Sequence, residues 1–355
     1  MSSRQEQFSG TREVLVAHQF DPEPLQEYMM SHVEGFHGPL TVRQFRGGQS
    51  NPTYLLESPS GRYVMRRKPP GKLLKSAHAV DREFRVISAL YGADFPVPRP
   101  YVLCKDEEIV GTMFFIMEFV EGRIFWELDM PDSDPQERTA TYEHANQTIA
   151  DLHNIDYEKI GLADFGKPGN YFARQISRWS KQYVASETEK ITAMNNLMGW
   201  LPDNIPDDES ATVVHGDYRL DNMIIHATEP RIIAVLDWEL STIGHPLGDF
   251  TYHLMAWQMP ETGMGSAGLD GKDLDALGIP SEKDYVASYC AKTGRANGIA
   301  NRDFYSAYNL FRIAAILQGI AGRVRDGTAA SVHAERAANA VAPLASLGWE
   351  YAQNA

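Results

Sequence analysis

The sequence predicts an α+β fold in two parts, a strand-rich part followed by a mainly helical part. In residues 40–118, short segments alternate apolar and polar side chains, which is the period-two pattern of β-strands. Beyond residue 122, apolar side chains recur every three or four positions, as they do in amphipathic helices. The chain has 355 residues, more than one ordinary hydrophobic core needs, so we expect two lobes or two domains. The boundary is predicted at 118–122, where the pattern changes.

The composition indicates a folded globular protein. Hydrophobic residues make up 43% and charged residues 23%, as in ordinary globular proteins. The net charge of −14 disfavours nonspecific binding to nucleic acids or anionic membranes. The two cysteines, Cys104 and Cys290, form neither a disulfide framework nor a metal-binding cluster. With no secretory or membrane-spanning apolar run, the expected location is the cytoplasm.

The strand-rich part begins with a predicted N-terminal arm. The arm spans residues 1–24, of which 1–20 are expected to be loosely held, and a helix is predicted to begin within 21–24 and to end before Gly35. Proline and glycine residues separate the following segments, as is usual between strands. We predict strands at 40–45, 53–57, 62–68, 101–104 and 112–117, with a helix at 76–91 before the last two.

A glycine-rich turn separates the first two of these strands. It contains Gly47, Gly48, Gln49, Ser50 and Asn51. Paired glycines let backbone amides approach a phosphate group closely. A plain hairpin turn explains the same residues equally well, so the turn alone does not establish a nucleotide site.

Two basic residues lie near the end of the strand at 62–68. Arg66 and Lys68 share one face of that strand, and Arg67 points to the other. Either shared-face cation could meet nucleotide phosphates, although a solvated basic strand end is the alternative. Glu83, at the edge of the apolar face of the next helix, could pair with this cation, but a surface position is the ordinary one for a glutamate.

The second part consists mainly of helices around three short apolar segments. One helix begins at Asp249, in a position favourable for a carboxylate, and runs to about residue 258. The short segments at 212–214, 223–225 and 232–236 are predicted strands. The other helices are predicted at 136–154, 170–201, 281–293, 301–323 and 329–353, with a polar break near 186–189 in the second.

The stretch from His215 to Asn222 joins two of these strands and contains the residues of greatest chemical interest. Asp217 and Asn222 follow one strand, and Asp237 follows the strand at 232–236. An aspartate can accept a hydroxyl proton, while carboxamide and carboxylate oxygens are ligands for Mg²⁺ on a nucleotide. A carboxylate-rich turn between two core strands is the structural alternative. His215 is most simply a donor that holds the loop.

Arg219 and Asp221 flank the same loop. Arg219 could steady a phosphate or a carboxylate of the acceptor, or it could pair with Asp221 or Asp249. The sequence contains no zinc-protease, C-x-x-C or dinucleotide-binding motif, so other catalytic chemistry has little support.

The residues His215-Gly216-Asp217 through Asn222, followed by Leu236-Asp237-Trp238, resemble the aminoglycoside phosphotransferase and choline kinase family. Within that family, the sequence is most similar to the kinase-like domain of acyl-CoA dehydrogenase family members ten and eleven, where a flavin dehydrogenase forms a separate, later part of the chain. The resemblance covers residues 25–330. With its 355 residues, the chain is expected to be the stand-alone kinase-like part.

The resemblance implies a bilobal protein-kinase-like fold, with an antiparallel-sheet N-lobe at 25–118 and a mainly helical C-lobe at 119–355. It implies that Asp217 is the catalytic base and that Asn222 and Asp237 hold magnesium. Arg66, or alternatively Lys68, takes the place of the phosphate-binding lysine of protein kinases. The remaining implied nucleotide contacts are a phosphate-covering loop at Gly47 to Asn51, the helix glutamate Glu83, and an adenine-binding hinge at Glu118 to Val120.

The expected function is therefore an ATP- and Mg²⁺-dependent phosphotransferase that acts on a hydroxyl group of a small molecule. The resemblance suggests a hydroxyacyl thioester or a related metabolite as the acceptor, and a functional link to an acyl-CoA dehydrogenase. An aminoglycoside or another cationic acceptor is the second candidate. A pseudokinase-like module that binds a nucleotide or acyl-CoA without turnover is the alternative from another class. A dimer is compatible with the sequence, which does not determine the oligomeric state.

Overall fold

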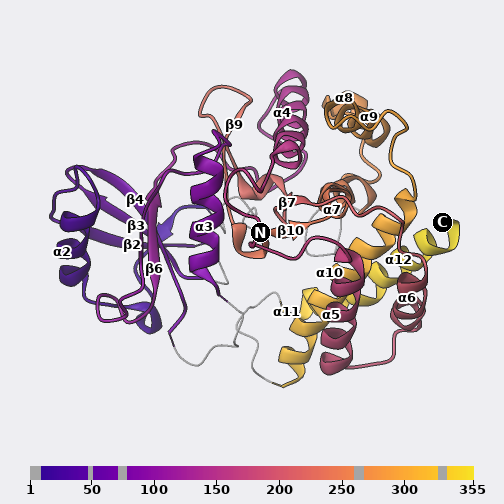
Figure 1. Cartoon of the computed structure of the whole chain (residues 1–355), viewed down its shortest axis with the longest axis horizontal. Helices are drawn as coiled ribbons and strands as arrows, with labels where there is room; N and C mark the ends of the chain where they lie inside the picture. Colours follow the sequence, from indigo (N-terminus) through magenta and orange to yellow (C-terminus); the bar gives the residue numbers. More distant parts are fainter. Residues whose placement is uncertain (1–8, 47–50, 71–77, 260–267, 327–333) are drawn as a thin grey trace. The chain divides into compact units, whose positions relative to one another are not determined.

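The computed structural model describes residues 9–46, 51–70, 78–259, 268–326 and 334–355. The chain forms two compact units, and each is described by itself (Figure 1). The first unit comprises Met1–Glu127, Glu158–Ala163 and Leu220–Ser241. The second comprises Leu128–Tyr157, Asp164–Arg219 and Thr242–Ala355.

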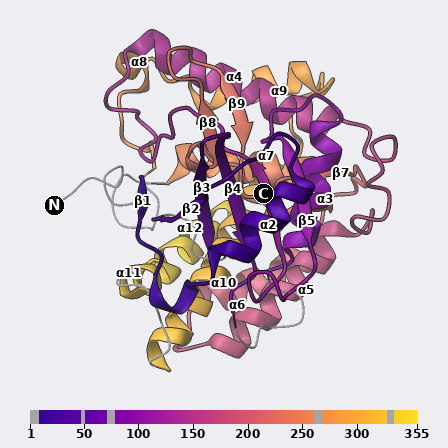
Figure 2. The ribbon, with the colours of Figure 1, turned by 90° about the vertical axis from the view of Figure 1, so that its left-hand side faces the viewer.

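An antiparallel sheet of six strands is the frame of the first unit (Figure 2). Its strands pair in the order β1-β2-β3-β4-β6-β5, so most neighbours are also consecutive in the chain. Each strand that the sequence predicts in this part is present. The strands are Thr11–Arg12 (β1), Thr41–Phe45 (β2), Thr53–Ser58 (β3), Gly61–Arg67 (β4), Pro100–Cys104 (β5) and Phe114–Glu118 (β6).

Helices α2 (Pro22–His32) and α3 (Val80–Tyr91) cover opposite faces of this sheet (Figure 1). On the α2 side, Met65 joins a buried cluster with Leu25 and Met29. On the α3 side, the rings of Phe84 and Phe115 contact each other with centroids 5.8 Å apart. Because successive side chains of a strand alternate between faces, the residue after Met65 points toward α3. The period-two pattern thereby directs Arg66 toward the helix that carries Glu83.

The N-terminal segment is more firmly attached than the sequence predicted. The described portion of the expected arm contributes β1, in which Thr11 pairs with Phe45. The carbonyl of His18, at the end of a 3₁₀ turn (Val16–His18), accepts hydrogen bonds from the Tyr54 hydroxyl at 3.0 Å and from Arg67 at 3.0 Å. The prediction of a loose arm failed here because these contacts join residues far apart in sequence.

A small hairpin outside the large sheet also belongs to the first unit. Strand β8 (Met223–Ile225) pairs with β9 (Ile232–Val235), as the apolar runs predict. The amide of Val235 donates to the Pro96 carbonyl at 2.8 Å. The sequence had placed this hairpin in the second lobe, whose start was predicted at residue 119. Its hydrogen bond to residue 96, together with the contact of α3 with the 3₁₀ turn Trp238–Leu240, explains why residues 220–241 group with the sheet instead.

The second unit is built mainly from helices around the buried helix α10 (Arg302–Arg325). Helices α5, α7 and α12 pack against it (Figure 1). A two-stranded sheet of β7 (Thr212–Val214) and β10 (Thr242–Gly244) completes the unit. The other helices are α4 (Pro135–Asn154), α5 (Tyr171–Ser186), α6 (Thr192–Asp203), α7 (Pro246–Gln258), α8 (Leu274–Leu277), α9 (Glu282–Lys292), α11 (Ala334–Asn339) and α12 (Val341–Asn354).

Three predicted helix boundaries change in this unit. The helix expected at 170–201 is divided into α5 and α6 at the predicted polar break. The final predicted helix, 329–353, is divided into α11 and α12. Helix α7 begins at Pro246 rather than Asp249, because the His245 side chain accepts a hydrogen bond from the Leu247 amide and caps the helix. Within the described residues, no helix combines the length and the apolar character needed to cross a bilayer.

Candidate active site

The loop after β7 is held by a buried carboxylate of α7. Asp249 accepts hydrogen bonds from the amides of His215 at 2.6 Å and Gly216 at 2.8 Å. Its side chain is 1% exposed and also lies 3.4 Å from the His153 ring. The hydrogen bonds from His153 and His215 keep the pKa of Asp249 low, although burial alone would raise it. A charged acceptor therefore fixes the backbone just before Asp217.

The side chain of Asp217 is oriented by two further donors. The Tyr252 hydroxyl donates a hydrogen bond to its Oδ1, and the Nε of Arg219 lies 3.3 Å from the same oxygen. The sequence suggests Asp221 or Asp249 as a partner of Arg219, and the structure adds Asp217. The ring of His215 is fully buried, and its Nδ1 accepts a hydrogen bond from the Asp217 amide at 3.1 Å, which leaves Nε2 as the donor nitrogen of the neutral ring.

Arg312 of α10 also contacts this loop. Its guanidinium donates to the Gly216 carbonyl at 2.6 Å and lies 5.0 Å from the ring centre of Tyr252. Burial alone would lower the pKa of Arg312, but surrounding tyrosines raise it, so the side chain stays charged. Sequence reasoning missed both Tyr252 and Arg312. Both lie in helices whose sequences are mostly apolar. A tyrosine or an arginine in such a helix needs a polar partner, and this could have marked both residues as candidates.

A second group of charged residues lies in the first unit, around Arg66. Its Nε is 3.2 Å from Glu83 Oε1, and its Nη2 is 3.0 Å from Asp237 Oδ1. A third carboxylate, Glu239, is 3.8 Å from the same Nη2. The Glu83 side chain is 1% exposed, so the expectation of a surface glutamate was wrong. We call these four residues, Arg66, Glu83, Asp237 and Glu239, the charge cluster.

The charge cluster contains one cation and three acids. Burial raises the pKa of Glu83 to about 8; Arg66 opposes this shift, and Asp237 and Glu239 reinforce it. Burial would lower the pKa of Arg66, but the three acids raise it overall. The cluster is therefore short of positive charge when all of its acids are ionised, and an added cation would relieve it.

Asp237 and Asn222 meet the chemical requirements of magnesium ligands. Asp237 has φ = 66°, an uncommon left-handed conformation for a residue that is not glycine. Asn222 ends the 3₁₀ turn Leu220–Asn222, and its carbonyl accepts from the Leu236 amide at 2.8 Å. In the described residues, no three histidine, cysteine or acidic side chains form a ready metal cage. Mg²⁺ commonly takes one or two protein oxygens together with nucleotide phosphates and water, so the donor set fits it.

The predicted phosphate-covering turn is described only at its end. Gly47, Gly48, Gln49 and Ser50 lie outside the described residues. Asn51 is buried; its Nδ2 donates to Glu239 at 3.2 Å, and its Oδ1 is 3.0 Å from His78 Nδ1. The end of the turn is thereby tied to the charge cluster.

The other two nucleotide-site predictions fall at the ends of the inner strands β4 and β6. Lys68 follows β4 and is half-buried, and within the described chain its ammonium has no hydrogen bond or ion pair. Glu118 ends β6, where its amide donates to the Arg99 carbonyl at 2.8 Å and its side chain accepts from the Arg99 amide at 3.2 Å. Val120 is half-buried two residues later.

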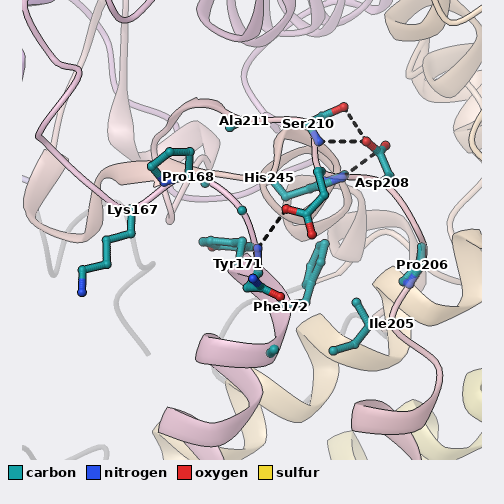
Figure 3. Close-up of a pocket in the computed structure, with 15 residues that line it drawn as sticks. Lys167, Pro168, Tyr171, Phe172, Ile205, Pro206, Asp208, Ser210, Ala211 and His245 are labelled. Carbon is teal, nitrogen blue, oxygen red and sulfur yellow. Dashed lines mark hydrogen bonds and ion pairs between the residues drawn. The ribbon is translucent and has the colours of Figure 1, made fainter.

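A pocket in the second unit contains none of the predicted site residues (Figure 3). Its walls come from 167–173, 205–211 and 244–245. His245 and Asp208 meet there with 3.2 Å between Nε2 and Oδ2, and Ser210 donates to Asp208 (Figure 3). Burial lowers the pKa of His245 to about 4, so the ring is neutral at physiological pH. The pocket lies at the cap of α7, and its lining includes none of residues 215–219.

Comparison with known proteins places the chain in a family. The model of the phosphotransferase enzyme family matches residues 41–281. The chain is 42% identical over 343 residues to acyl-CoA dehydrogenase family member 11 of Rattus norvegicus, with 95% of the chain and 44% of that relative covered. The chain thus spans less than half of that curated relative.

Solved structures agree with this assignment. A Ralstonia eutropha protein, provisionally described as an aminoglycoside phosphotransferase, superimposes with a TM-score of 0.86 and 52% identity, covering 95% of this chain and 99% of that one. A thermostable aminoglycoside phosphotransferase, APH(4)-Ia, in complex with ADP and hygromycin B shares the fold at a TM-score of 0.57 and 13% identity, covering 93% and 98%. The predicted α+β, protein-kinase-like fold is confirmed. The chain belongs to the phosphotransferase enzyme family.

Proposed function

We propose that this protein transfers the γ-phosphoryl group of ATP to a hydroxyl group of a small-molecule acceptor. The observation that carries the proposal is the anchoring of Asp217 by one rigid helix, through Asp249 and Tyr252. A general base must be held in place before its substrate arrives if it is to accept a proton efficiently. Few structural roles would require a half-buried aspartate to be oriented in this way.

In the proposed reaction, Asp217 accepts the hydroxyl proton while the acceptor oxygen attacks the γ-phosphorus and the bond to ADP breaks. Asn222 and Asp237 would hold Mg²⁺, whose charge offsets that of the phosphates. Arg66, anchored by Glu83, would bind a phosphate as the lysine of protein kinases does. In this scheme the deficit of positive charge in the charge cluster is met by the metal ion.

The acceptor proposed is an anionic hydroxy compound, such as a hydroxyacyl thioester of coenzyme A. Arg219 and Arg312 both lie near Asp217, and two cations favour an anionic acceptor over an aminoglycoside. The likeness to acyl-CoA dehydrogenase family members supports a link with acyl-CoA metabolism, and such an acceptor fits the cytoplasm. The acceptor is the part of the proposal that most needs direct measurement.

The test is a panel of hydroxy acids, hydroxyacyl-CoA esters and aminoglycosides incubated with ATP and Mg²⁺, with phosphorylated product detected by mass. Asp217→Ala should reduce product formation by about 10²- to 10⁴-fold. Equal rates in the wild type and this variant would refute Asp217 as the base.

Nucleotide binding is tested separately by thermal shift. ATP should raise the unfolding temperature more with Mg²⁺ than without it, and Asp237→Ala should remove the difference. Stabilisation by acyl-CoA with no effect of ATP would instead indicate a binding module without turnover.

A further inference from the structure

Tyr252 lies on α7 one turn beyond Asp249. Asp249 binds the amides of His215 and Gly216, and the Tyr252 hydroxyl binds Oδ1 of Asp217. Residues three apart in a helix share a face, so one side of α7 fixes both the backbone and the functional side chain of this loop. The two contacts have different effects. Asp249 fixes the position of the loop backbone, and Tyr252 fixes the orientation of the Asp217 carboxylate.

The position of the Tyr252 ring is itself restrained. The ring is 6% exposed, and the guanidinium of Arg312 lies 5.0 Å from its centre. Arg312 is held in turn by its hydrogen bond to the Gly216 carbonyl. Charged groups that face the carboxylate include Arg219 from its own loop and Arg312 from α10. Burial, reinforced by Asp217, raises the pKa of Tyr252, so its hydroxyl remains a donor throughout the physiological range.

We propose that Tyr252 is a positioning residue for Asp217, whose hydroxyl holds the carboxylate in the orientation that receives the acceptor proton. This inference rests on the proposed function. Tyr252 keeps its own proton, and the acceptor proton goes to Asp217. An aspartate side chain has two freely rotating bonds, and displacing a reacting group by about 1 Å can cost about 10²-fold in rate. A donor fixed by α7 and Arg312 removes that freedom.

The test is Tyr252→Phe, which removes the hydroxyl and keeps the ring against Arg312. ADP release is measured at steady state over a range of ATP concentrations with Mg²⁺, with water and with β-hydroxybutyryl-CoA as acceptors. We expect kcat to fall about 10- to 100-fold while KM for ATP changes less than about 2-fold. Tyr142→Phe is the matched control, because it removes another buried hydroxyl, bonded to the Leu128 carbonyl at 2.7 Å, and should leave the rate unchanged.

The outcomes separate this inference from the proposed function. In an Asp217→Ala background, Tyr252→Phe should cause no further loss, because the two residues act as one unit. A normal kcat for Tyr252→Phe, or the same loss in Tyr142→Phe, would overturn the positioning role alone. If Asp217→Ala were as active as the wild type, the proposed function would fail and this inference would fail with it.

Discussion

The loop after β7, residues 215–219, is held together with Asp249 of α7 in a different way from the charge cluster. In the loop, Asp249 and Asp217 accept hydrogen bonds from backbone amides and a tyrosine hydroxyl, groups that keep their protons at any physiological pH. In the cluster, the guanidinium of Arg66 lies against both Glu83 and Asp237, and a backbone group of Trp238 adds a hydrogen bond to Glu83. The first arrangement needs no ligand to be complete, whereas the second has more negative than positive charge.

This difference indicates how the two regions should respond to ligands. Because donors of the protein itself, among them the Tyr252 hydroxyl and Arg312, hold the loop, its geometry should be the same with and without a nucleotide. In the charge cluster, by contrast, the ion pair between Arg66 and Asp237 must change when ligands bind, since Asp237 is the residue proposed to bind the metal. A phosphate that attracts Arg66 would release Asp237 for Mg²⁺, so we expect ATP and Mg²⁺ to bind cooperatively.

The largest effect is expected for Asp249→Ala in the loop. The change leaves the amides of His215 and Gly216 without their acceptor, at about 1–3 kcal/mol each, so the free energy of unfolding should fall by about 2–6 kcal/mol. Phosphoryl transfer should be lost as well. Urea unfolding gives the stability, and Asp249→Asn, which keeps one acceptor oxygen, should be intermediate. Wild-type stability in the alanine variant would contradict the anchoring role.

The same residue predicts a pH dependence. The pKa of Asp249 is lowered on folding, so its stabilising contribution is present above the unfolded value of about 3.9 and is lost as the pH falls through the folded value. Unfolding measured between about pH 2 and 5 should therefore be less sensitive to acid in Asp249→Asn than in the wild type. If the free energy of unfolding fell equally steeply with decreasing pH in both proteins, groups other than Asp249 would control the acid sensitivity.

In the charge cluster, Arg66→Ala is expected to weaken ATP binding by about 10- to 100-fold, because a charged hydrogen bond contributes about 1.5–3 kcal/mol. Mg²⁺ alone should raise the unfolding temperature of this variant more than that of the wild type, because Asp237 and Glu239 have lost their cation. Lys68→Ala is the matched control on the same strand face and should change ATP affinity less than about 3-fold. A larger effect for Lys68 would reverse the assignment of the phosphate-binding cation.

A smaller effect is expected for Glu83→Gln. The pKa of Glu83 is raised to about 8, against about 4.3 in the unfolded chain, so stability falls as the pH rises between these values. Glutamine resembles the protonated form, so the variant should lose this slope and be at least as stable as the wild type near pH 8. Above pH 8, where the Glu83 carboxyl is ionised, the KM of the variant for ATP should be a few-fold higher than that of the wild type, because Arg66 then lacks a charged anchor. An unchanged slope of stability against pH would show that Glu83 ionises normally.

Local patterns predicted the elements better than the contacts between them. Alternation in β4 correctly put Arg66 and Arg67 on opposite faces, because strand geometry depends on neighbours in sequence. For Glu83 the sequence left open a surface position and a pairing with the strand cation, and local patterns could not decide between them, because the decision depends on a partner in a different element. Tyr252 and Arg312 were missed for the same reason, since periodicity reports that a residue faces the core but not which group it meets there.

Replacing Arg219 is expected to have the smallest effect on stability, and it tests most directly whether the acceptor is anionic or cationic. Its side chain is 36% exposed, so its ion pair with Asp217 should contribute at most about 1 kcal/mol to stability. Arg219→Ala should raise KM for β-hydroxybutyryl-CoA about 3- to 10-fold and leave KM for ATP unchanged. The control is Arg231→Ala, which breaks an exposed pair with Glu229 and should alter neither value. If Arg219→Ala instead improved the use of an aminoglycoside and left the thioester unaffected, the acceptor would be cationic, and the second candidate from the sequence would replace the first.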